Sequence, residues 1–95
     1  MKSQRDKLIA DRINDVSLSL EDLSRFPQSE ACRERAQNAI KMLRKTFRDD
    51  SYPEIFLLLA MGYIANNIEG GMAYRNATMS GRKVAWTMLA DVLGD

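Results

Sequence analysis

Histidine is absent from this 95-residue chain, and its absence removes several kinds of chemistry at once. Histidine is the most frequent general base, a common zinc ligand and the usual partner of a serine or cysteine nucleophile. A Gly-rich phosphate-binding loop is also missing, because the only adjacent glycines are the pair Gly70-Gly71. The acidic side chains form no paired-carboxylate arrangement typical of acid–base catalysis. We therefore expect no enzyme activity, no catalytic residue, no metal site and no cofactor.

Cysteine and net charge are scarce too. Cys32 is the only cysteine, so the chain cannot form an internal disulfide, and a lone thiol fits a reducing compartment. A net charge of +1 gives no bulk attraction to nucleic acid or to a membrane surface. The N-terminal residues are charged and no apolar run follows them, which argues against a signal peptide. These features predict a cytoplasmic protein that does not bind membranes.

What the chain does have is one long apolar stretch, from Ile55 to Ala65, inside a helix predicted over about 53–68. The stretch is about half of the ~20 residues that a membrane span needs. A helix that is apolar all round has to be surrounded by other elements, so the pattern predicts a central helix. Changing Leu58 or Leu59 to Ala is then expected to cost ~2–5 kcal/mol of stability. Gly70-Gly71 suit the end of this helix, where a left-handed residue is favoured.

The rest of the chain is predicted to form amphipathic helices around that segment. The first runs from about Arg5 to Phe26, and its apolar residues follow intervals of 4, 3, 4 and 3, typical of the buried face of a bundle helix. They are Ile9, Ile13, Val16, Leu20 and Leu23. The second is predicted from Ser29, near its N-cap, to about Arg48. Ser51 is a candidate cap for the apolar helix.

The C-terminal part is less sharply patterned. Residues 72–79 fit either a loop or the early turns of a helix, and Thr78 or Ser80 is expected to cap the last helix. Trp86 is expected in the core, where bundles of this size bury a large aromatic side chain. The chain is therefore predicted to be all-α, with residues 1–95 forming a single-domain bundle of three to four helices around a central apolar helix.

A basic stripe follows one side of the second predicted helix. Its members, which recur at helical spacing, are Arg33, Lys41, Arg44 and Arg48. Two interpretations stay open. In an antiparallel hairpin, Asp11, Asp15 and Asp22 of the first helix lie near the stripe, each exposed pair being worth ~0–1 kcal/mol. Alternatively, basic residues on successive turns can follow a nucleic-acid backbone.

Candidate contacts with a protein partner lie in two places. On the first helix, Leu8, Leu18 and Phe26 are predicted to form a second apolar strip of the kind that marks an interface. In the unclear segment, side chains suited to an adaptable contact are Met72, Tyr74 and Met79. We hypothesise a small non-enzymatic helical protein–protein interaction module, acting as a regulator, inhibitor or chaperone-like protein and self-associating as a dimer. The alternative is a nucleic-acid-binding regulator that uses the basic stripe.

Overall fold

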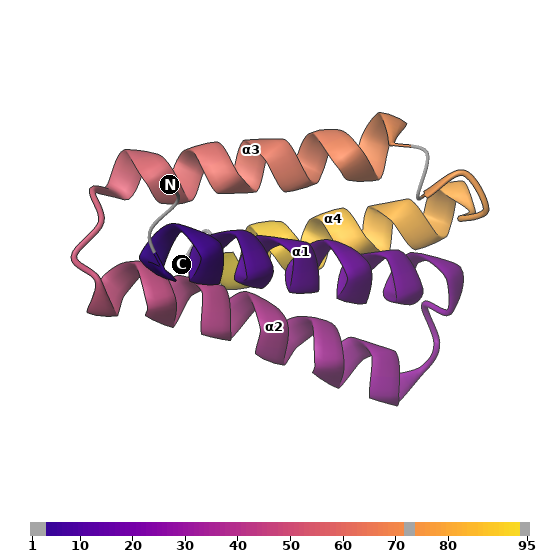
Figure 1. Cartoon of the computed structure of the whole chain (residues 1–95). Helices are drawn as coiled ribbons and strands as arrows, with labels where there is room; N and C mark the ends of the chain where they lie inside the picture. Colours follow the sequence, from indigo (N-terminus) through magenta and orange to yellow (C-terminus); the bar gives the residue numbers. More distant parts are fainter. Residues whose placement is uncertain (1–3, 72–73, 94–95) are drawn as a thin grey trace.

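The computed structural model describes residues 4–71 and 74–93, and these residues form four α-helices without a strand. The helices are α1 (Gln4–Arg25), α2 (Glu30–Asp49), α3 (Glu54–Gly70) and α4 (Met79–Leu93). Short connections join them, so consecutive helices run in opposite directions (Figure 1). The predicted all-α bundle is confirmed. No helix in this described part of the chain combines the length and the apolar character needed to cross a bilayer.

Helices α1 and α4 lie in the middle of the bundle, and α2 and α3 flank them from opposite sides (Figure 1). Each flanking helix contacts both middle helices, whereas α2 and α3 hardly contact each other. The helix with the broadest packing is therefore the amphipathic α1. Each flanking helix has one side that meets the bundle and another side that has no neighbour within the chain.

The core consists of the inward sides of all four helices. The predicted apolar seam of α1 is confirmed as a bundle face, since Val16, Leu20 and Leu23 are buried. From α2 they meet a narrow stripe that includes Ile40 and Leu43. Each fully buried side chain of this kind contributes about 1.5–3 kcal/mol through removal of apolar surface from water. The most extensive packing in the bundle is between α1 and α2.

Helix starts follow local hydrogen bonding. Ser29 is the N-cap of α2 and its hydroxyl accepts a hydrogen bond from the backbone N–H of Cys32, as predicted from the sequence. The N-cap of α3 is Pro53, which makes no side-chain capping bond. Ser51, the predicted cap, is instead a turn residue with a positive φ of 56°. The turn places Ser51 two residues before the cap position, so the expected role is wrong.

Residues 74–78, which precede α4, form a turn rather than an extension of the last helix. Gly71 is the C-cap of α3 with φ −73°, so the left-handed conformation expected for this glycine is wrong. Tyr74 begins a short turn, and α4 starts at Met79. The Thr78 hydroxyl accepts a hydrogen bond from the backbone N–H of Gly81, which supports the predicted capping role of Thr78.

Close packing of α1 on α4 depends on Gly81. A Cβ atom at this position would lie 1.9 Å from the backbone oxygen of Ser24, closer than any non-bonded contact allows. The backbone of α1 therefore occupies the space that a side chain at position 81 would need. Leu20 of α1 and Leu89 of α4 are both buried in the core.

Helix α3 lies at the edge of the bundle, and the expectation that it is central is wrong. Its buried residues are Ala60, Ile64 and Ile68, which recur every four positions and face α1 and α4. Leu58 and Leu59, by contrast, are more than half exposed. The sequence of an apolar helix without periodicity does not indicate which side of the helix is buried. In this bundle only one side of α3 contacts other helices.

Candidate partner-binding face on helix α3

The outward side of α3 carries a concentration of large apolar side chains. They are Ile55, Phe56, Leu58, Leu59 and Tyr63, each between 45% and 62% exposed, with the exposed Gly62 among them. At 100° per residue these six residues occupy one half of the helix circumference. We call this surface the α3 face. Since a large apolar side chain has about 150–250 Å² of surface, the face offers on the order of 500 Å² to solvent.

The α3 face is uncharged over its whole length. The only charged residues of α3 are Glu54, before the face, and Glu69, near the C-terminal end of the helix. The phenol of Tyr63 and the exposed amide of Asn66 are the polar groups on this side. The face can therefore lose water without separating a charge from its solvent, which favours contact with another apolar surface.

Both ends of α3 are attached to the bundle. At the N-terminal end, the rings of Phe47, Tyr52 and Phe56 pack edge to face, with centroid distances of 5.3 and 5.6 Å. At the other end, the Arg82 guanidinium donates hydrogen bonds to the backbone oxygens of Glu69 (3.3 Å) and Tyr74 (2.7 Å). The face is thus presented on a helix whose position is set from both ends.

A groove of about 540 Å³ runs between α1 and α3, next to the α3 face. The exposed side chains of Leu18 and Tyr63 both line it, one from each helix. The hydroxyl of Ser17 is buried in its wall without a hydrogen-bond partner among the described residues. The groove extends the apolar surface of α3 towards α1 and brings one predicted contact residue, Leu18, close to it.

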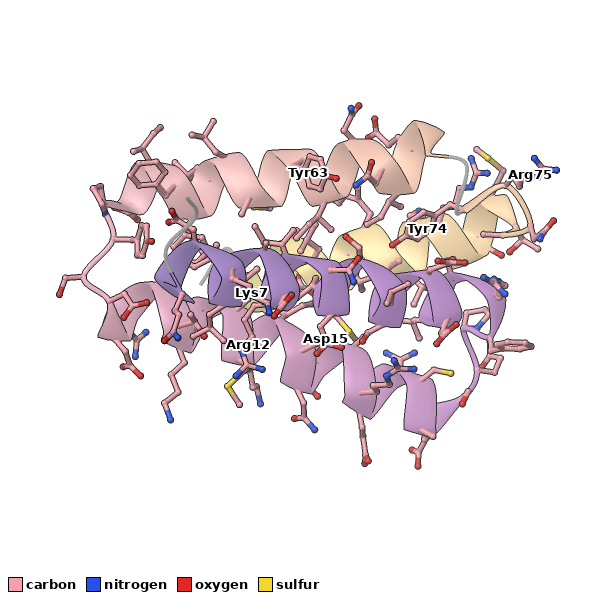
Figure 2. All side chains as sticks on the ribbon, in the orientation of Figure 1. Lys7, Arg12, Asp15, Tyr63, Tyr74 and Arg75 are labelled. Atoms are coloured by element: carbon pink, nitrogen blue, oxygen red, sulfur yellow. The ribbon has the colours of Figure 1, made fainter. Side chains whose placement is uncertain are left out.

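Tyr74 is buried, so its expected role as an exposed partner contact is wrong. Only 1% of its surface is exposed, and its hydroxyl donates a 2.7 Å hydrogen bond to the backbone oxygen of Ser17. Figure 2 shows Tyr63 on α3 and Tyr74 in the space between α3 and α1. Burial, and secondarily the carboxylate of Asp22, raise the pKa of Tyr74 above its ordinary value. The residue fixes the α3–α4 corner onto α1.

The other predicted partner contacts do not form one surface. Leu8, Leu18 and Phe26 are exposed, but Leu8 and Leu18 lie ten residues or about 15 Å apart along α1, and Phe26 follows the end of this helix, eight residues after Leu18. Met79 is 83% exposed and lies with Trp86 beside a shallow pocket of about 290 Å³ between α3 and α4. Met72 is outside the described residues. The strip predicted on α1 is therefore a set of isolated exposed side chains.

Trp86 was expected in the core, and that expectation is wrong because 42% of its surface is exposed. Trp86 lies on the side of α4 that faces the C-terminal end of α3. Together with Ile68 it lines the shallow pocket between these two helices. The bundle fills its centre with smaller side chains, Ala85 and Leu89 from α4 among them. The tryptophan is left at the edge.

The basic stripe lies on the α4 side of α2. Arg33, Lys41 and Arg48 are exposed, whereas Arg44 is half-buried and its guanidinium reaches the backbone oxygen of Val92 at 3.4 Å. Arg44 thus contacts α4. Arg35 of α2 forms an ion pair with Asp22 of α1, in which Nη1 lies 2.9 Å from Oδ2.

No group of three or more metal-ligating side chains occurs among the residues that the structure describes. Comparisons with family models, with curated proteins and with solved structures found no match to this chain. The functional argument therefore depends on the surface itself. Every residue of the α3 face belongs to the apolar run from Ile55 to Ala65, which the sequence pattern predicts to be interior. The exposure of this run depends on how the four helices pack, and the sequence alone does not reveal it.

Proposed function

We propose that this chain is a non-enzymatic protein–protein interaction module that binds its partner through the α3 face. The observation that carries the proposal is the exposure of Ile55, Phe56, Leu58, Leu59 and Tyr63 on one side of one helix. The largest apolar patch of a typical monomer covers about 300–600 Å² and is often functional, and the α3 face is near the top of that range. A cytoplasmic location belongs to the same proposal and is supported by the single cysteine.

Burial against a partner is also the energetically favourable outcome for this surface. Removal of apolar surface from water contributes about 25 cal/mol per Å², and the face has no charge that would oppose its desolvation. Aromatic side chains such as those of Phe56 and Tyr63 are enriched at the centres of interfaces. The α3 face thus combines the composition and the size of a contact patch.

Site-specific photo-crosslinking in cells tests the proposal. A photoreactive amino acid at Leu59, on the α3 face, is expected to form discrete adducts with a protein, either another copy or a different chain. The matched control is the same amino acid at Asn38, which is exposed on α2. Equal labelling at the two positions, or no adduct at Leu59, would contradict the proposal.

A second candidate function is nucleic-acid binding through α2. The observation that favours it is the exposure of Arg33, Lys41 and Arg48 on one side of α2. A second groove lies between α2 and α4, and both Arg33 and Lys83 line it. Phosphate contacts make affinity fall with salt by about one power of salt concentration per contact. Binding of a DNA duplex that weakens steeply with salt, and that Lys41→Glu abolishes, would support this candidate. A flat salt response would exclude it.

A further inference from the structure

We propose that the occupant of the α3 face is a second copy of this chain, with Gly62 at the point of closest approach. The inference rests on the proposed function, which requires a partner but does not specify one. It concerns the same face and names what covers it. Three properties of α3 support a second copy: its lack of charge, its area and its exposed glycine.

The lack of charge makes the face complementary to itself. A two-fold symmetric contact places the same patch on both sides of the interface, so any charge would meet its own image nearby. Between Ile55 and Ile68 the helix has no charged residue. A strongly charged partner finds nothing to pair with there, whereas a second apolar face fits without an unpaired group.

The area reaches the lower limit for a specific dimer interface. Each face offers on the order of 500 Å², so two faces in contact bury on the order of 1,000 Å², the area that a specific interface needs. Leu18, across the groove beside Tyr63, is exposed next to the face and can add to this contact. A second α3 face is therefore a sufficient partner.

Gly62 gives the most specific argument. It lies in the interior of α3, where glycine is a poor helix former, and it is exposed. A Cβ atom added to Gly62 would have no neighbour within 4 Å, in contrast to Gly81, whose missing side chain makes room for the backbone of α1. Nothing in the chain itself occupies the space at Gly62. Because Gly62 has no side chain, the space beside Leu58, Leu59 and Tyr63 is open, and a side chain of another helix can pack there.

The spacing of Leu59 and Gly62 specifies an arrangement. If two α3 helices cross antiparallel about a two-fold axis between these residues, each Leu59 packs against the Gly62 of the other copy. The two residues lie on one side of the helix because they are three positions apart. An antiparallel crossing also sets the two helix dipoles in opposite directions, which is the favourable orientation.

Sedimentation equilibrium of the purified full-length chain tests this inference with the variant Gly62→Gln. The wild type is expected to be a dimer, and the variant is expected to raise the dissociation constant about tenfold or more, because a long side chain fills the gap. The control is Gly70→Gln, at the C-terminal end of the same helix, where a Cβ also meets no neighbour. This control is expected to leave the dimer intact.

Circular dichroism of the same samples separates misfolding from dissociation. Gly62→Gln is expected to keep the helical signal of the wild type, and Gly62→Ala is a milder second variant for the same measurement. A wild type that stays monomeric at concentrations of about 100 μM would overturn the second copy as occupant. A dimer that Gly62→Gln leaves as tight as the wild type would overturn the placement of Gly62.

The two proposals fail in distinguishable ways. If the purified chain is monomeric while the photoreactive residue at Leu59 captures a different protein, the second copy is excluded and the interaction module stands. If the chain is monomeric and Leu59 captures nothing, both are excluded. If Leu59 captures another copy of the chain and Gly62→Gln removes that adduct, both are supported.

Discussion

Helices α2 and α3 both lie on the outside of the bundle but present opposite surfaces to solvent. Both pack against the α1–α4 pair, from opposite sides (Figure 1). Helix α2 buries a stripe that includes Ile40, Leu43 and Phe47 and exposes mostly charged side chains. Helix α3 is far more apolar, yet it buries only three residues and exposes five large apolar ones. The apolar content of α3 therefore exceeds what its place in the fold requires.

The comparison shows that the neighbours of a helix, rather than its hydrophobicity, determine how much of it is buried. A flanking helix has one inward side whatever its sequence. On α2, charges occupy the outward side and keep it in water at little cost. On α3 the outward side remains apolar, so a requirement outside this single chain accounts for it best. Protein binding is the requirement that we propose.

The largest expected effect comes from leucine truncation on the two flanking helices. Leu43→Ala in α2 is expected to destabilise the fold by ~2–5 kcal/mol, because it removes a fully buried side chain. Leu59→Ala in α3 is expected to cost less than ~1 kcal/mol in the monomer, because the side chain already lies mostly in water. Urea denaturation of dilute protein measures both. Equal losses would remove the distinction between the two helices.

The attachment of α3 to the bundle is probed by Tyr74→Phe. The change removes the hydrogen bond that the phenol donates to the backbone oxygen of Ser17, and it is expected to cost ~0.5–1.5 kcal/mol. Thermal unfolding at neutral pH measures this loss. Leu59→Gln, which changes an exposed residue of the same region, is the control and is expected to leave stability of the dilute monomer nearly unchanged.

The same residue predicts a pH dependence. Since burial raises the pKa of Tyr74, the folded protein keeps the phenol proton at a pH where the unfolded chain, with an ordinary pKa of about 10, loses it. Stability from this group is complete below pH ~10 and falls above it, by about 1.4 kcal/mol per pH unit. Urea titrations between neutral and alkaline pH measure the slope. In Tyr74→Phe, the loss of unfolding free energy with pH should be smaller by about 1.4 kcal/mol per pH unit, which corresponds to one proton. An unchanged slope would argue against a buried phenol.

Helix capping gives a smaller difference between the flanking helices. Ser29→Ala is expected to cost ~0.5–2 kcal/mol, because it removes the side-chain cap of α2. Helix α3 has no side-chain cap, so the neighbouring Ser51→Gly, which suits a positive φ, is expected to be neutral or slightly stabilising. Thermal denaturation of the two variants tests this. A cost at Ser51 comparable to that at Ser29 would contradict the assigned N-caps.

The smallest effect has the opposite sign. Gly62→Ala is expected to stabilise the monomer by ~0.5–1 kcal/mol, because alanine is a better helix former and its Cβ meets no neighbour. The corresponding change at Gly81 is expected to destabilise, since the backbone of Ser24 occupies that space. Urea denaturation of dilute protein measures both changes. A loss of monomer stability at Gly62 would show that the gap is already filled within the chain.

Local sequence patterns predicted the helices and their buried sides well where the apolar residues are confined to one side of the helix. The spacing of Leu20 and Leu23 in α1 and the capping by Ser29 are local properties, and both were confirmed. The position of α3 could not be predicted, because a helix that is apolar all round has no preferred inward side. Tyr74 and Trp86 were misplaced for a related reason. Whether each is buried or exposed depends on contacts between segments distant in the sequence, which no local pattern contains.

Encounters between two α3 faces would receive no electrostatic guidance, because the helix lacks charge from Ile55 to Ile68. Proteins without such steering associate at about 10⁵–10⁶ M⁻¹ s⁻¹, and differences in affinity then arise mainly from the dissociation rate. A tight complex at this surface would therefore be long-lived. Chains made at the same time and place would pair with one another and exchange slowly with those already assembled.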